Sequence, residues 1–354
     1  PGVFLRAASA IAVCAVALTV APGPRAHAAT LQVPADYAEI QDALDAAQDG
    51  DTVLVAPGTW AGPLALAGKT VTLASHFVLQ GDPALIAQTV IDGGDGSYAI
   101  FVDDSVGPAT TIQGFTIRNA DDGVRADGSY RLLDSHITGA GDGLQYTGGG
   151  GLVQGCLIQG NRDDGIDLDD DVALVIEDND IVDNGGSPSL DGDGIEIRLQ
   201  NYQGPTIQVV IRNNRIDRNT SDGVQLISYD VTTQRVIRIE GNSFVANRLA
   251  ALGMMCCTDS EEDFEGADLG ERVLVAGNSF VGNGHGITGG DDVVVLNNLF
   301  VSTTQLALKR LRGSSIAAHN LFWQNGGNWS DAIVDVGSSL LQDPLLAPDL
   351  SLLP

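Results

Sequence analysis

Lysine, cysteine and aromatic residues are all scarce in this chain of 354 residues. Lys69 and Lys309 are its only lysines, so arginine supplies nearly all of the positive charge. Outside the N-terminal region the cysteines are Cys156 and the adjacent pair Cys256 and Cys257, an odd number that excludes a disulfide framework and has no zinc-site spacing. A bond between the adjacent pair would be strained, and the sequence leaves it open.

Few aromatics and abundant glycine favour one class of structure. Aromatic residues make up 5% of the chain, and there are 44 glycines. This composition is typical of many short strands joined by tight turns, and it argues against a helical bundle. We therefore expect an all-β fold.

The balance of charge excludes several partners. The chain carries 46 acidic residues against 18 lysines and arginines, a net charge of −28. Such a surface repels nucleic acid and anionic membranes. It also repels acidic polysaccharides unless cations or a local basic patch intervene. We expect no nucleic-acid partner and no membrane insertion of the processed chain, and the sequence leaves the oligomeric state open.

The longest apolar run covers residues 7–21 and is short for a membrane span. Arg6 precedes it, and Ala26-His27-Ala28 has the small-x-small form of a cleavage site. This pattern predicts a signal peptide over residues 1–28 and a secreted or cell-surface protein, extracellular or periplasmic. Because the chain starts with proline rather than methionine, we expect further residues upstream.

Residues 29–60 predict a cap and a first strand. Apolar residues recur at helical spacing from Ile40 to Ala47, and Asp36 is a candidate N-cap. Residues 52–56 are apolar, as in a buried strand. A short capping helix that leads into a strand covers the open end of a repeat domain, which would otherwise expose backbone and apolar core.

From about residue 110 the chain repeats an apolar strand, a small polar residue and a second short strand. The position after the first strand holds Gly114, Ser135, Cys156, Asn179, Asn214, Asn242, Asn278, Asn298 and Asn320. The position after the second holds Asn119, Ala140, Asn161, Asn184, Asn219, Asn247, Asn283, Thr303 and Asn325. The shorter spacings suit a coil of three strands. Coils stack about 4.8 Å apart, so asparagines at one turn can hydrogen bond to each other.

The run from Leu31-Gln32-Val33-Pro34 to Thr59-Trp60, with the asparagine-rich coils that follow, resembles secreted bacterial right-handed β-helix repeat proteins. The resemblance implies a right-handed parallel β-helix of the pectin-lyase-like kind, a single-stranded solenoid over residues 61–342. Residues 343–354 resemble the end of the helical domain in that family, a tail that we expect to continue further. The family includes polysaccharide lyases, hydrolases, epimerases and proteins without known activity, so the resemblance implies no single reaction.

Aspartate precedes glycine at one point of successive coils, an arrangement that we call the Asp column. Its members are Asp122, Asp142, Asp164, Asp193 and Asp222. An Asx turn explains such a pattern without any ligand. Carboxylates stacked roughly 5 Å apart repel one another, however, unless backbone N–H groups or a cation compensate. Because calcium takes about six to eight oxygen ligands, we hypothesise a Ca²⁺ site at Asp164, Asp169 and Asp193, and no organic cofactor.

An outward-facing column lies beside the Asp column. It reads Arg125, Gln145, Asp167, Glu196 and Gln225. Asp167 and Glu196 therefore fall on neighbouring coils, where two carboxylates match the geometry of a retaining glycosidase and each raises the pKa of the other. We predict this pair as the catalytic residues. The alternative is a solvated acidic face on a very acidic protein.

Arginine is unevenly distributed around these acids. Residues 163–196 contain no lysine or arginine, whereas residues 212–248 are rich in arginine. An acidic face beside an arginine face suits an anionic sugar with bridging calcium, and packing between coils is the alternative. The predicted substrate-binding residues are Arg125, Arg198, Arg212 and Arg215. Extra residues in the longest coils predict loops at 186–190, 200–205 and 250–270.

Two functions remain open at this point. The first is an extracellular carbohydrate-active protein that binds or cleaves a polysaccharide, of the lyase or glycoside hydrolase type. The second is a non-catalytic surface, adhesin or structural protein that uses the β-helix as a rigid spacer. Product formation from a polysaccharide would discriminate between them.

Overall fold

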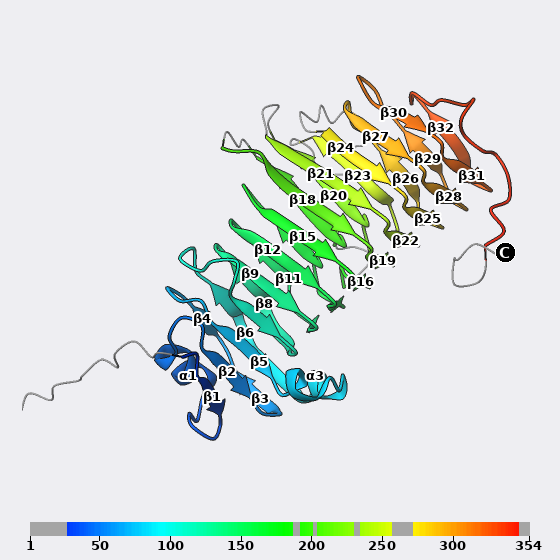
Figure 1. Cartoon of the computed structure of the whole chain (residues 1–354). Helices are drawn as coiled ribbons and strands as arrows, with labels where there is room; N and C mark the ends of the chain where they lie inside the picture. The colour runs from blue at the N-terminus through cyan, green and yellow to red at the C-terminus, as the bar shows by residue number, and fades with distance from the viewer. Residues whose placement is uncertain (1–26, 187–191, 201–203, 230–233, 257–271, 347–354) are drawn as a thin grey trace, which may run out of the picture.

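The computed structural model describes residues 27–186, 192–200, 204–229, 234–256 and 272–346 (Figure 1). The predicted signal peptide lies almost wholly outside these residues, as do Cys257, most of the three predicted loops and the end of the tail. No helix in the described ranges is long and apolar enough to cross a membrane.

The chain winds into an elongated solenoid in which three parallel ladders run side by side (Figure 1). The first ladder is a 12-stranded sheet. Its strands are β1 (Thr30–Val33), β2 (Thr52–Val55), β5 (Thr72–Ser75), β7 (Thr111–Gln113), β9 (Ser129–Leu133), β12 (Gly150–Gln154), β15 (Ala173–Glu177), β18 (Ile207–Arg212), β21 (Arg235–Glu240), β24 (Arg272–Ala276), β27 (Val293–Leu296) and β30 (Ile316–Ala318).

Two long strands, β6 (Thr89–Val102) and β8 (Thr116–Ala126), bend through the second and third ladders. The second ladder adds β3 (Gly58–Ala61), β10 (His136–Thr138), β13 (Leu157–Gln159), β16 (Asp180–Val182), β19 (Arg215–Asp217), β22 (Ser243–Val245), β25 (Ser279–Val281), β28 (Leu299–Val301) and β31 (Leu321–Trp323). The third adds β4 (Leu64–Leu66), β11 (Asp142–Tyr146), β14 (Ile166–Leu168), β17 (Ile195–Leu199), β20 (Val224–Ser228), β23 (Ala250–Cys256), β26 (His285–Thr288), β29 (Leu306–Lys309) and β32 (Gly327–Ser330).

The core follows from alternation along these short strands, because every second side chain points inward. Equivalent inward residues stack from coil to coil. Phe244, Phe280, Phe300 and Phe322 form one such stack, with ring centroids 5.0, 4.7 and 5.1 Å apart. One residue per coil therefore builds a continuous apolar column from few aromatics.

The predicted asparagine ladder is confirmed, and it fastens consecutive coils. Asn214 is typical: its Oδ1 accepts from the backbone N–H of Asn179 at 3.0 Å. Its Nδ2 donates to the backbone oxygen of Ile176 at 2.9 Å and to Oδ1 of Asn242 at 3.0 Å. Each amide thus uses its oxygen and its nitrogen, so a buried polar side chain carries no unmade hydrogen bond.

The predicted cap is present as α1 (Ile40–Ala46), whose apolar residues are buried against the first coil. The N-cap prediction was wrong: the helix is preceded by Glu39, and Asp36 instead accepts a hydrogen bond from the backbone N–H of Gln32. β1 and β2 already pair in the first ladder. The parallel stack therefore begins within residues 29–60.

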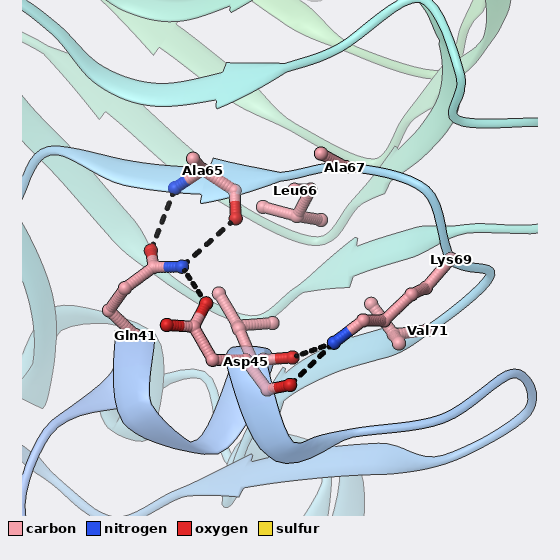
Figure 2. Close-up of a pocket in the computed structure, with 8 residues that line it drawn as sticks. Gln41, Asp45, Ala65, Leu66, Ala67, Lys69 and Val71 are labelled. Carbon is pink, nitrogen blue, oxygen red and sulfur yellow. Dashed lines mark hydrogen bonds between the residues drawn. The ribbon is translucent and has the colours of Figure 1, made fainter. Parts of the chain in front are cut away.

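Figure 2 shows how α1 is held over the first coil. The amide of Gln41 accepts from the N–H of Ala65 at 2.8 Å and donates to its carbonyl at 3.3 Å, as a paired strand would. Lys69 Nζ donates to the carbonyls of Leu44 and Asp45 at the helix C-terminus, at 2.9 and 2.6 Å. The side chain of Gln41 thus takes the place of a neighbouring strand at the edge of β4. A pocket of about 260 Å³ lies beside it.

The prediction of a loop over 250–270 was wrong in its first part. Ala250–Cys256 forms β23, which pairs with β20 and β26. Met254 is fully buried in the core. Two further short helices, α2 (Phe77–Gln80) and α3 (Ala84–Gln88), lie beside the early coils, and Figure 1 labels α3.

Candidate functional site

The third ladder aligns the predicted outward column as the sequence register requires. Gln145 pairs with Arg125 on one side and with Asp167 on the other. Asp167 pairs with Glu196, and Glu196 with Gln225. Asp167 and Glu196 are therefore direct register neighbours on β14 and β17, about 4.8 Å apart along the backbone stack.

These two carboxylates are buried although they point away from the apolar core. Asp167 is 2% exposed and Glu196 is 8% exposed. A solvated acidic face does not describe them. Burial of charge is unfavourable unless it is paired, so their contacts decide what the site can do.

Arg198 is the group that compensates this charge. Its Nη1 lies 2.8 Å from Asp167 Oδ2 and 3.0 Å from Asp169 Oδ1. Its Nη2 contacts Glu196 Oε1. Gln145 adds a hydrogen bond from Nε2 to Asp167 Oδ2 at 3.1 Å. One guanidinium therefore holds three carboxylates.

Asp167 keeps one oxygen outside this network. Its Oδ1 is buried and has no hydrogen-bond partner within the described residues. A buried carboxylate oxygen without a donor is costly if it is ionised. The arrangement therefore favours a proton or a ligand atom at this oxygen.

Burial raises the pKa of both Asp167 and Glu196 to about 7. Arg198 lowers the pKa of each, and the carboxylate of Asp169 raises both. For Arg198, burial opposes the charged form, but the carboxylates of Asp167 and Glu196 raise its pKa, so it stays cationic. Two carboxyl groups that titrate near neutral pH beside a fixed cation are suited to proton transfer.

The Asp column lies next to this cluster, and its contacts differ from the local ones of the Asx turns that the sequence suggested, because each Oδ1 accepts from a backbone N–H of the next coil. Asp142 Oδ1 accepts from the N–H of Asp164 at 3.1 Å, and Asp164 Oδ1 accepts from the N–H of Asp193 at 2.7 Å. Asp193 Oδ1 accepts from the N–H of Asp222 at 2.7 Å. Burial raises the pKa of Asp142 to about 7, and burial with the neighbouring charge of Asp193 raises that of Asp164 well above its usual value.

A group that could hold a metal ion is formed by Asp164, Asp193 and Glu196, whose oxygens all lie within 4.8 Å of one another. Oxygens bound to one Ca²⁺ ion lie up to about 5 Å apart, so the group fits that ion. The structure brings Asp164 and Asp193 together as predicted. It adds Glu196 in place of Asp169, whose carboxylate lies against Arg198.

The four predicted substrate-binding arginines do not share one face. Arg125 lies on the third ladder with Arg198, and it pairs with Asp122 at 3.5 Å. Arg212 is on the first ladder, paired with Glu177 of the preceding coil. Arg215 is on the second ladder, 2.7 Å from Asp180 of the preceding coil. Packing between coils, the alternative given above, describes the last two.

Sequence reasoning underrated the centre of the site, Arg198. It lies two residues after Glu196 on β17, so strand alternation puts both side chains on one face. That spacing was a usable signal. Burial of Asp167 and Glu196 left no such signal, because it depends on surrounding chain segments rather than on the repeat.

Comparison with known proteins agrees with this architecture. Residues 98–260 match the family model "Right handed beta helix region". Among curated protein sequences, none matches the chain. The mannuronan C-5 epimerase AlgE4 A-module of Azotobacter vinelandii has a TM-score of 0.56 and 18% identity, covering 86% of this chain and 93% of its own. The AlgE6 A-module of the same organism has a TM-score of 0.52 and 14% identity, covering 86% and 94%.

A third similar structure is the catalytic unit of the GH87 α-1,3-glucanase from Streptomyces thermodiastaticus strain HF3-3, with a TM-score of 0.51 and 14% identity over 92% of this chain and 72% of that one. At such identities the likeness concerns the fold. The family model, the parallel ladders and these structures lead to one conclusion. The chain folds as a right-handed parallel β-helix, and its residues 98–260 match the model of that region.

Proposed function

We propose that this protein is an extracellular carbohydrate-active protein that binds and cleaves a polysaccharide on the third ladder. The observation that carries the proposal is the pairing of Asp167 and Glu196 on adjacent strands, both with a pKa raised to about 7. The names of the similar structures, which include epimerases and a glucanase, support a carbohydrate substrate. The signal-like N-terminus supports export.

Each residue receives a role from its position. Near neutral pH the pair Asp167 and Glu196 holds about one proton between its members, so one carboxyl can donate while the other accepts. Arg198 lies over both and its side chain is 30% exposed. A sugar therefore meets the guanidinium first, and we assign Arg198 to substrate contact, with Arg125 further along the same face.

Calcium would be held by Asp164, Asp193 and Glu196. When bound, the ion would neutralise buried carboxylates and attract an acidic sugar. Glu196 cannot ligate the ion and act as a free acid or base at once. A lyase-type reaction on an acidic glycan should therefore be stimulated by Ca²⁺, whereas a hydrolase-type reaction through Asp167 and Glu196 should be inhibited by it.

The test is a product assay on neutral and acidic polysaccharides, with Ca²⁺ or with EDTA. New reducing ends report cleavage of either kind, and unsaturated products distinguish elimination from hydrolysis. Asp167→Asn and Glu196→Gln should each lower turnover about 100-fold or more if the pair performs proton transfer. The matched control is Glu177→Gln, the same kind of change on the first ladder, where Glu177 pairs with Arg212 away from this site. Full activity of both carboxylate variants would reject this site.

One observation favours a second function. Asp167 and Glu196 are nearly inaccessible beneath Arg198, as expected of an ion-pair network that stabilises coils. In that case the protein is a non-catalytic surface or structural β-helix. It would form no product from any glycan, and Asp167→Asn would change its thermal stability alone.

A further inference from the structure

A groove runs along the second ladder, on a different face from Asp167 and Glu196. It consists of two pockets of about 230 and 390 Å³ that share Gly155 and Leu157. The first is walled by Pro83, Ile86 and Ala87 at α3. The second is lined by charged residues, among them Asp180 and Arg215. We call the two pockets together the second-ladder groove.

The floor of the groove is set by strand register. His136 on β10 pairs with Leu157 on β13, Leu157 with Asp180 on β16, and Asp180 with Arg215 on β19. These side chains stand in one column at about 4.8 Å steps, parallel to the solenoid axis. The groove is therefore straight and about 14 Å long over three steps. One end is apolar and the other is polar.

The polar end is preorganised rather than closed. Arg215 contacts Asp180 and Asp217, each at 2.7 Å, which fixes the orientation of the guanidinium. The side chains of Arg215 and Asp180 remain 42% and 49% exposed. Hydrogen-bonding groups are thus held in place yet open to solvent, a condition that favours ligand binding because little order is lost.

The apolar end contains an unexplained polar atom. His136 Nε2 is buried and has no hydrogen-bond partner among the residues that the structure describes. Burial lowers the pKa of His136, so the ring is neutral at pH 7 and this nitrogen can donate or accept. The ring lines the pocket as a neutral, half-buried surface rather than as a charged one.

We propose that the second-ladder groove binds a neutral glycan chain, with the sugar rings lying along the solenoid axis. A pyranose ring has an apolar C–H face for Leu157 and Ile86 and hydroxyl groups for the exposed Asp180 and Arg215. One coil step is comparable in length to one sugar ring. The carboxylates of Asp134 and Asp178 on the rim repel uronates, which excludes acidic glycans.

This groove is independent of the proposed catalytic face. It uses the second ladder, and none of its lining residues belongs to the cluster around Arg198. It also gives Arg215 a binding role apart from the one that the sequence predicted. The groove would hold a polysaccharide while another part of the same chain is processed, which raises local substrate concentration.

The experiment measures binding of the full chain to neutral hexasaccharides of β-1,4-glucan, β-1,4-mannan, β-1,4-xylan and α-1,3-glucan by titration calorimetry, with oligogalacturonate as the acidic comparison. We expect at least one neutral probe to bind and oligogalacturonate not to bind at this groove. Asp180→Ala and Leu157→Ala should each weaken binding about tenfold.

Leu299 supplies the matched control, because it occupies the same outward column on β28, outside the groove. Leu299→Ala removes the same atoms from the same ladder and should not change affinity. Circular dichroism checks that each variant is folded. Absence of binding to every neutral probe would overturn the proposal, and so would equal loss from Leu157→Ala and Leu299→Ala. Affinity for the acidic probe that the groove variants abolish would overturn it as well.

Discussion

Two stacked columns run through this β-helix, one of asparagine and one of aspartate. Both bind backbone N–H groups, but with side chains of different charge. In both, a side-chain Oδ1 accepts an N–H from a neighbouring coil, as in Asn214 and Asp164. The asparagines also donate through Nδ2 and are neutral. The aspartates crowd carboxyl groups together, and the pKa values of Asp142 and Asp164 rise.

The difference separates scaffold from site. The amide satisfies the turn completely, and it recurs along most of the solenoid. An amide would serve the Asp column equally well as an acceptor, so fold stability alone does not explain the carboxylates. They occupy five successive coils, and the coils of Asp164 and Asp193 also carry Asp167, Glu196 and Arg198. Buried acids kept at some expense of stability are typical of functional sites.

The largest expected change in the free energy of unfolding comes from a substitution that makes the asparagine ladder resemble the Asp column. Asn214→Asp replaces the donor that faces Ile176 and Asn242 with a second acceptor and buries a charge. We expect the free energy of unfolding to fall by about 3–5 kcal/mol, measured by urea denaturation at pH 8.

The adjacent Asn213 provides the control, because it is exposed and carries the same side chain. Asn213→Asp adds the same charge one residue away and should change the free energy of unfolding by less than about 0.5 kcal/mol. Equal effects of the two substitutions would contradict the view that the ladder's amide donors are essential.

The scaffold was predictable because a solenoid repeats its chemistry. The column from Asn179 to Asn320, the Asp-Gly turns and the alignment of Asp167 with Glu196 all follow from counting residues along the sequence. Register then fixes which residues are neighbours without any knowledge of loops. This is why the fold and the positions of both columns agree with the structure.

Long-range contacts limited the prediction of the site. Arg212 and Arg215 follow the acidic residues 163–196 closely in sequence. The turn between the two arginines nevertheless puts Arg212 on the first ladder and Arg215 on the second. Asp36 accepts a hydrogen bond from the nearby N–H of Gln32 instead of capping the helix, and the strand from Ala250 forms because it pairs with the preceding coil. The burial of Asp167 depends on neighbouring coils, and no local pattern encodes it.

The Asp column and its neighbours should make stability depend on pH between about 5 and 8. The pKa values of Asp142, Asp167 and Glu196 are about 7 in the folded protein, above their ordinary values of 3.8 and 4.5. A carboxyl with a raised folded pKa binds a proton more tightly in the folded state, so stability falls as pH rises towards 7 and is then constant. The lowered pKa values of Asp92 and Asp183 act below about pH 4, outside this window.

In EDTA we expect the free energy of unfolding to be higher at pH 5 than at pH 8 by about 2–3 kcal/mol, discounted from the full shifts. Ca²⁺ needs ionised ligands, so it should stabilise the protein at pH 8 and have little effect at pH 5. The double variant Asp167→Asn with Glu196→Gln should lose about half of the pH dependence, because Asp142 and Asp164 keep their raised pKa values. A thermal midpoint that is equal at the two pH values would contradict the raised pKa values, and one unchanged by chelator at pH 8 would contradict the metal site.

The smallest expected change in the free energy of unfolding comes from a substitution that makes the Asp column resemble the asparagine ladder. Asp164→Asn keeps an Oδ1 acceptor for the N–H of Asp193 and removes one charge from the group with Asp193 and Glu196. In EDTA at pH 8 the variant should be more stable than the wild type by about 1 kcal/mol, while stabilisation by Ca²⁺ disappears. Asp122→Asn is the matched control, because it makes the same substitution at the head of the same column. There the carboxylate pairs with Arg125 instead of with other acids. If Asp164→Asn destabilises the protein as much as Asn214→Asp does, the carboxylates are part of the scaffold, and the distinction between the two columns fails.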